Sequence, residues 1–214
     1  MFESQRASLF AAQGTPFMQK LILADPNASL CSAWQQAFKS YPGVTIINSR
    51  FEEVPHFDCM VSAANSFGLM DGGVDLAIAR FFGPALQVRV QAHILTYYTG
   101  EQPVGTSFIV ETGHPRHPYV AHTPTMRVPM PIHTTDHVYL ATKALLEAVA
   151  AFNAPQERIR VVVCPGLGTA TGRMPVEEAA RQMALAYRYY LDPPQAISWP
   201  YAAARNRNII SGDD

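Results

Sequence analysis

The chain has 214 residues, of which 48% are hydrophobic and 15% are charged, a balance typical of one globular domain. Its formal net charge is −1 and its 16 basic residues form no run, which argues against bulk binding to nucleic acid. No apolar segment approaches the roughly 18 residues of a membrane span, and the amino terminus lacks the hydrophobic core of a secretory signal, so we expect a cytoplasmic protein with no membrane partner.

Short apolar runs alternate along the chain with amphipathic segments. The apolar runs predict strands at 21–25, 44–47, 59–63, 106–111, 119–123 and 160–164. Apolar residues at helical spacing predict helices that begin at Ser29, at Gly72, near Leu86, at Thr134 or Thr135, and at Pro175. This alternation predicts an α/β fold, a three-layer α/β/α sandwich with a central mixed, mainly parallel sheet. We expect a single domain over 1–214, with its core at about 19–191 and peripheral extensions at 1–18 and 195–214.

Two glycine-rich loops follow predicted strands. In the first, 61–75, a strand passes through a polar turn into a helix that begins behind Gly72 and Gly73. Such a helix start presents unpaired backbone N–H groups and the positive end of the helix dipole, which suits a phosphate. The second loop, 164–175, repeats the arrangement about a hundred residues later. Because ligands of parallel sheets bind beyond the carboxyl ends of the strands, the two loops predict a ligand with more than one phosphate held between them.

These motifs resemble those of the macrodomain family, the α/β modules that bind ADP-ribose. The segment 62–66 is similar to the family's Asn-Ala-Ala-Asn-Ser, and 72–75 is similar to its glycines followed by Val-Asp. Ten residues separate Asn65 from Asp75, as in the family. The segment 119–123 resembles the family's strand ending in His-Thr, and 165–175 resembles its second phosphate loop. The resemblance covers about 44–191 in collinear order.

The resemblance implies binding of ADP-ribose or a derivative in a crevice between the two loops, without a cofactor. It places the ligand against Ser62, Ala64, Asn65, Gly72, Gly73, Val74, Asp75, Gly166, Leu167, Gly168, Thr169, Ala170, Thr171, Gly172 and Arg173. Arg173 is absent from the common pattern and is included because a guanidinium pairs with phosphate, a solvent-facing side chain being the alternative.

Two residues are candidates for catalysis. In family members that hydrolyse ADP-ribosyl bonds, the residue matching Asn65 hydrogen-bonds the distal ribose and the one matching Asp75 orients or activates water. Members that only bind also keep this aspartate. The resemblance therefore implies a hydrolase of ADP-ribosyl or O-acetyl-ADP-ribose bonds, with an ADP-ribosylated protein as a further partner, or a non-catalytic ligand-sensing or interaction module. Taken without the resemblance, Asn65 is a turn residue that caps its own backbone, and Asp75 is a carboxylate that stabilises a helix dipole.

Other positions depart from the family pattern. Asp71 replaces a glycine and either caps the helix through its side chain or meets the ligand. Ala170 also replaces a glycine, and any need for a left-handed backbone there shifts to Gly168 or Gly172. Phe51 stands about where the family has its adenine-binding aspartate, next to Glu52 and Glu53. Recognition of adenine is therefore expected to be weak.

Histidines and cysteines give no strong signal. Five of the seven histidines lie within 113–137: His114, His117, His122, His133 and His137. His133 and His137 have the spacing of a shared helical face, but prolines interrupt the segment, so we expect loop or cap histidines and no metal. The segment 124–129 is expected to wall the pocket near the distal ribose. The three cysteines are far apart and are expected to be buried, inert thiols: Cys31, Cys59 and Cys164.

Overall fold

Strands and helices alternate along the chain in this computed structural model, which describes residues 18–212. The elements, in chain order, are β1 (Lys20–Ala24), α2 (Ala28–Ala37), β2 (Val44–Ile47), the 3-10 turn η1 (Phe51–Glu53), β3 (Cys59–Asn65), α3 (Gly73–Phe82), α4 (Ala85–Tyr98), β4 (Phe108–Glu111), β5 (Tyr119–Met126), α5 (His137–Asn153), β6 (Val161–Cys164), α6 (Val176–Leu191) and α7 (Trp199–Ser211). The predictions made for residues 1–17 and 213–214 lie outside the described residues.

Within residues 18–212, six strands form one sheet in the order β2-β1-β6-β3-β5-β4. β4 pairs antiparallel with β5 and the other pairings are parallel, so the predicted mixed, mainly parallel sheet is confirmed. The central strands are buried on both faces. In β1, for example, Leu21 and Leu23 belong to one core cluster, whereas Ile22 and Ala24 belong to the other. Burial on both faces explains why these strands read as continuous apolar runs.

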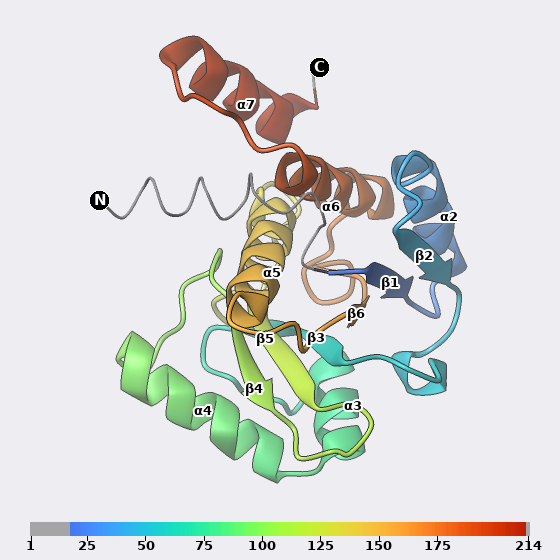
Figure 1. Cartoon of the computed structure of the whole chain (residues 1–214), viewed down its shortest axis with the longest axis vertical. Coiled ribbons are helices and arrows are strands. Elements are labelled where there is room, and N and C mark those ends of the chain that lie inside the picture. The colour runs from blue at the N-terminus through green and yellow to red at the C-terminus, as the bar shows by residue number, and fades with distance from the viewer. Residues whose placement is uncertain (1–17, 213–214) are drawn as a thin grey trace.

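Helices cover both faces of the sheet (Figure 1). On one face, α2, α5 and α6 bury Trp34, Leu145 and Met183 in a shared core. On the other face, α3 and α4 bury Ile78 and Val90 in a second core. The structure is therefore the three-layer α/β/α sandwich that the sequence predicts.

Three predicted helix starts are wrong by a few residues. α2 is capped by Asn27, because its Oδ1 accepts from the Ser29 and Leu30 amides at 3.0 and 3.3 Å. α5 begins at His137, with Asp136 as its N-cap residue, so His133 lies outside the helix and the predicted shared face does not exist. Pro175 is the N-cap residue of α6 rather than its first helical residue.

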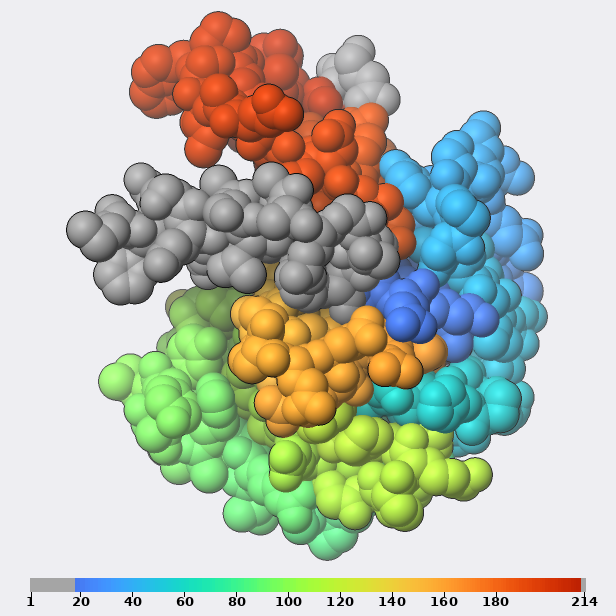
Figure 2. Space-filling model, in the orientation of Figure 1, coloured from blue at the N-terminus to red at the C-terminus, as the bar shows by residue number. Residues whose placement is uncertain are grey.

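The chain has a further helix, α7, that the sequence pattern does not predict. None of its described residues is buried, so no apolar stripe marks it in the sequence. Arg181 of α6 holds it, donating from Nη1 and Nη2 to the carbonyl oxygens of Asn208 and Ile209, both at 2.8 Å. Figure 2 shows α7, at the red end of the colour range, protruding beyond α6. No helix in residues 18–212 is both long and apolar enough to cross a membrane.

Candidate ligand-binding and active site

A cleft of about 500 Å³ lies beyond the carboxyl ends of four strands. Its lining includes Asp25 after β1, Asn65 at the end of β3, Met126 at the end of β5 and Pro165 after β6. This is where parallel α/β sheets bind ligands, because loops from neighbouring strands diverge there. Both glycine-rich loops open into this cleft, as the sequence predicts.

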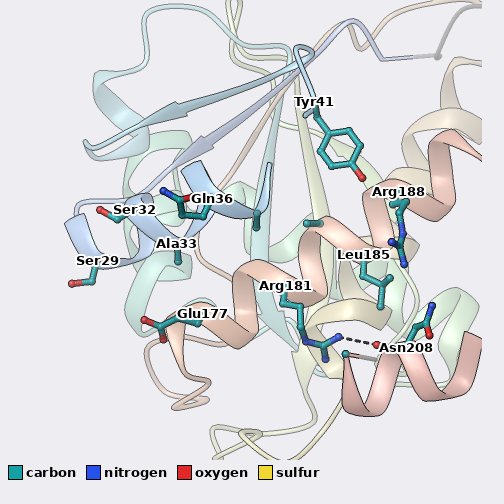
Figure 3. Close-up of a pocket in the computed structure, with 13 residues that line it drawn as sticks. Ser29, Ser32, Ala33, Gln36, Tyr41, Glu177, Arg181, Leu185, Arg188 and Asn208 are labelled. Atoms are coloured by element: carbon teal, nitrogen blue, oxygen red, sulfur yellow. Dashed lines mark hydrogen bonds between the residues drawn. The ribbon is translucent and has the colours of Figure 1, made fainter. Parts of the chain in front are cut away.

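A second hollow, of about 770 Å³, lies between α2, α6 and α7 (Figure 3). It is the larger of the two, but neither glycine loop lines it. Ala33 and Leu185 are among the residues that line it. The guanidinium of Arg181 is occupied by the carboxylate of Glu178 and by two carbonyl oxygens of α7. We therefore take the cleft at the strand ends as the candidate functional site.

The first glycine loop leaves the start of α3 open toward the cleft. Gly72 is the N-cap residue, with extended backbone (φ −146°), and no side chain caps the helix. The suggested capping role of Asp71 is therefore wrong. Gly73 has a φ of 55°, a conformation that L side chains rarely adopt. A Cβ added to Gly72 or Gly73 would meet no described heavy atom within 4 Å, so a ligand can approach this backbone closely.

The second glycine loop is folded back on itself. Gly168 has the left-handed backbone (φ 70°) and Ala170 does not, so the predicted shift of that conformation to Gly168 is confirmed. Arg173 is also left-handed (φ 53°). The Met174 amide donates to the Gly168 carbonyl oxygen at 3.0 Å, which closes the loop. At its start, the Gly166 amide donates to Oδ2 of Asp25 at 3.1 Å, so β1 and the loop are joined across the edge of the cleft.

The Asn65 side chain is engaged by its own loop. Its Oδ1 accepts from the Phe67 and Leu69 amides at 3.1 and 3.3 Å, and its Nδ2 donates to the Leu69 carbonyl oxygen at 2.7 Å. This is the turn-capping role that the sequence leaves open. Asn65 lines the cleft, and its Nδ2 carries a second N–H besides the one donated to Leu69.

Asp75 is a buried carboxylate in the first turn of α3. It is 6% exposed and lines the cleft. Burial raises its pKa to about 6, while a hydrogen bond from Ser62 lowers it and the nearby charge of Asp71 raises it. Ser62 Oγ donates to Asp75 Oδ1 at 2.6 Å. A carboxylate with this pKa is mostly ionised at pH 7 and can accept a proton, as a general base must.

The cleft contains most of the predicted ligand-binding residues, but three of them do not line it: Ser62, Leu167 and Arg173. Ser62 is buried beneath Asp75, Leu167 is fully buried in the core, and Arg173 is exposed. Thr125, Met126 and Pro129 line the cleft, so the segment 124–129 forms part of its wall, and its place near a distal ribose stays a prediction.

Other lining residues were not predicted as site residues, including Asp25, Asn27 and Arg50. The sequence feature that could have indicated Asp25 as a site residue is its position at the end of a predicted strand. Its place in the site follows only from the pairing of β1 with β6, and no local pattern shows that pairing. Phe51 and Glu52 also line the cleft.

The histidines and cysteines named in the sequence analysis have contacts or burial typical of structural residues. His114 and His117 stack on each other and on phenylalanine rings, with His117 3.9 Å from Phe57 between ring centroids. In residues 18–212 no group of three or more His, Cys, Asp or Glu side chains is arranged to hold a metal ion. The cysteines are buried, and burial raises the pKa of the Cys59 and Cys164 thiols, so the expectation of inert thiols agrees with the structure.

Comparison with known proteins agrees with this geometry. The model of the Macro domain family matches residues 61–183. An uncharacterized protein of Aquifex aeolicus is 36% identical over 128 residues, which cover 59% of this chain and 70% of that protein. A macro domain-containing protein of Streptomyces nogalater is 33% identical over 126 residues, which cover 59% and 67%. The chain therefore belongs to the macro domain family.

Solved structures support the fold. The macrodomain of Mycobacterium tuberculosis DarG has a TM-score of 0.53 and 21% identity, over 64% of this chain and 84% of that one. A mutant macrodomain of Oceanobacillus iheyensis has a TM-score of 0.55 and 20% identity, over 72% and 84%. The family match begins within β3, so β1, α2 and β2 precede it.

Proposed function

We propose that the cleft binds ADP-ribose or a derivative of it, with the pyrophosphate between the two glycine-rich loops. The observation that carries this proposal is the uncapped start of α3, where Gly72 and Gly73 face the cleft opposite the loop 166–172. Backbone N–H groups at a helix start bind phosphate without needing a basic side chain. Among the structural neighbours, the Oceanobacillus iheyensis mutant was solved with ADPR, and a Trypanosoma brucei macrodomain was solved with ADP.

We propose further that Asp75 assists hydrolysis of a bond at the distal ribose. In this reaction Asp75 accepts a proton from a water molecule that attacks the anomeric carbon or the acyl carbon. The bond from that carbon to the group it leaves, the modified side chain or the ribose oxygen, breaks, and the leaving group departs with the electron pair while Asn65 holds the ribose. The raised pKa and the burial of Asp75 within the cleft support this role. An ADP-ribosylated protein or O-acetyl-ADP-ribose is the corresponding substrate.

A second function is favoured by the state of Asn65. Because its amide already makes three hydrogen bonds within the loop, the site also suits a module that binds ADP-ribose and releases it unchanged. The two functions differ in turnover and not in binding.

One titration tests the shared part of the proposal. ADP-ribose added to the protein in a calorimeter should release or absorb heat with saturation. A ligand that binds only the native state should also raise Tm by mass action. If millimolar ADP-ribose produced no heat and no increase in Tm, nucleotide binding would be refuted. Product release from O-acetyl-ADP-ribose or an ADP-ribosylated protein then separates the hydrolase from the binding module.

A further inference from the structure

The cleft at the strand ends has an excess of negative charge for a site that binds a diphosphate. Its described lining residues include one basic side chain, Arg50, and four carboxyl groups, those of Asp25, Glu52, Asp71 and Asp75. No lysine or histidine is among these lining residues. The pyrophosphate of ADP-ribose is itself negative, and like charges repel. An excess of carboxylates therefore suits a ligand that has a positive group as well as the pyrophosphate.

Two of the four carboxyl groups are engaged by the protein itself. Asp25 accepts from two backbone amides, at 2.9 and 3.1 Å, and Asp75 accepts from Ser62 Oγ at 2.6 Å. The other two, Asp71 and Glu52, are exposed. Glu52 lies in η1, whereas Asp71 belongs to the first glycine loop.

Asp71 is presented to the cleft by a backbone that is fixed on both sides. The Met70 amide donates to Oε1 of Gln87 at 2.9 Å, and the Met70 side chain is buried. On the other side, Gly72 is the N-cap residue of α3, which has no side-chain cap. In residues 18–212 no hydrogen bond or ion pair engages the Asp71 carboxylate. A ligand can therefore pair with it without breaking a contact of the fold.

Asp71 also lies beside the residue proposed as the general base. Burial is the main cause of the raised pKa of Asp75, and the charge of Asp71 raises it further, so the two carboxyl groups interact. The carbon attacked by a water molecule that Asp75 activates must lie near Asp75. We therefore expect the group bonded to that carbon to come within reach of Asp71.

We infer that Asp71 is a specificity-determining residue that pairs with a cationic leaving group, so that the preferred substrate carries ADP-ribose on the guanidinium of an arginine side chain. This inference rests on the proposed function of the cleft. A guanidinium makes a planar, bidentate pair with one carboxylate, so a single exposed aspartate is enough to recognise it. The positive charge also offsets the repulsion between the carboxylates and the pyrophosphate.

The reaction on such a substrate follows the proposed mechanism. Asp75 accepts a proton from water, the water oxygen bonds to the anomeric carbon, and the bond from that carbon to the guanidinium nitrogen breaks. The electron pair stays on the nitrogen, so arginine leaves as a neutral guanidine. The guanidine then takes a proton from solvent, and Asp75 returns its proton to solvent. Because Asp71 pairs with the substrate before the bond breaks, its loss should act mainly on KM.

Two peptides that differ only in the modified residue test the inference, one ADP-ribosylated on arginine and the other on serine. Their dissociation constants are measured by calorimetry in EDTA, in an Asp75→Asn background that prevents turnover. We expect the arginine-linked peptide to bind about fivefold tighter or more. Asp71→Asn should abolish this preference and leave Tm unchanged, because the side chain is exposed. Binding of free ADP-ribose should become tighter in Asp71→Asn, since one repulsive charge is lost.

Glu52→Gln is the matched control, because Glu52 is the other exposed carboxylate of the cleft. It should leave the ratio of the two dissociation constants unchanged, whereas high salt should lower the arginine preference by screening. Equal binding of the two peptides, or an arginine preference that survives Asp71→Asn, would overturn the inference. So would a need for Mg²⁺ in place of EDTA, which would identify a metal ion as the cation. If neither peptide nor ADP-ribose binds, the proposed function fails, which is a distinct result.

Discussion

Gly73→Val tests whether the first glycine loop holds a phosphate. Gly73 has a φ of 55°, so a valine there is strained by about 1–2 kcal/mol. A Cβ at this position meets no described heavy atom within 4 Å, so strain is the main expected cost to the fold. One kcal/mol moves the Tm of a protein of this size by about 2–4 °C. We therefore expect a folded protein whose Tm is lower by roughly 2–8 °C.

The valine side chain would occupy the cleft where a phosphate approaches the backbone. Each charge-assisted hydrogen bond that is lost costs about 1.5–3 kcal/mol, which corresponds to roughly 10–150-fold weaker binding of ADP-ribose by calorimetry. Two neighbouring variants separate strain from obstruction. Gly83→Val strains the opposite end of α3, at a φ of 90°, outside the cleft. Gly72→Val obstructs the cleft at an extended residue.

Only the cleft variants, Gly73→Val and Gly72→Val, should lose binding. Wild-type affinity in both, or an equal loss in Gly83→Val, would show that the anion site lies elsewhere.

Asp75→Ala should lower turnover of an ADP-ribosyl or O-acetyl-ADP-ribose substrate by ~10²–10⁴-fold with much less effect on Kd. Asn65→Ala should lower turnover and also weaken binding. Steady-state rates that survive both substitutions would exclude these residues from catalysis. The raised pKa of Asp75 makes its contribution to stability fully present below pH 3.8 and lost as the pH rises through about 6. Denaturant unfolding from pH 4 to 8 should therefore show wild type losing about 2 kcal/mol relative to Asp75→Asn, and parallel curves would contradict this. Without the family's adenine-binding aspartate, ADP-ribose should compete with other nucleoside-diphosphate riboses within ~100-fold, and a larger preference would point to Asp25 or Glu52.

The sequence predicts the strands well because each is a short apolar run, and the sheet buries both faces of its central strands. The first glycine loop is also predicted from the sequence, because a left-handed backbone at the start of a helix requires a glycine, and Gly73 is visible in the local sequence. Features that depend on contacts between residues distant in sequence cannot be predicted from local sequence patterns. Asp25 reaches Gly166, 141 positions away, only because β1 pairs with β6. α7 has no buried apolar face, so the spacing of apolar residues does not predict this helix.

The cleft combines two parts of the chain with different relations to the family. Both glycine loops lie within the family match at 61–183, and they line the side proposed for the phosphates. The segments 24–27 and 50–52 precede the match and line the cleft with charged and aromatic side chains.

Residues 24–27 leave the end of β1, which lies between β2 and β6 and buries both of its faces. Residues 50–52 are held by the buried ring of Phe51. Substitutions on their exposed polar residues, such as Arg50 and Glu52, therefore change the cleft without opening the core. We expect ligand preference in this protein to depend on residues 24–27 and 50–52, and phosphate affinity to depend on the glycine loops. Charge reversal at Glu52 should accordingly change the ranking of nucleotides, while Gly72→Val should weaken all diphosphate ligands alike.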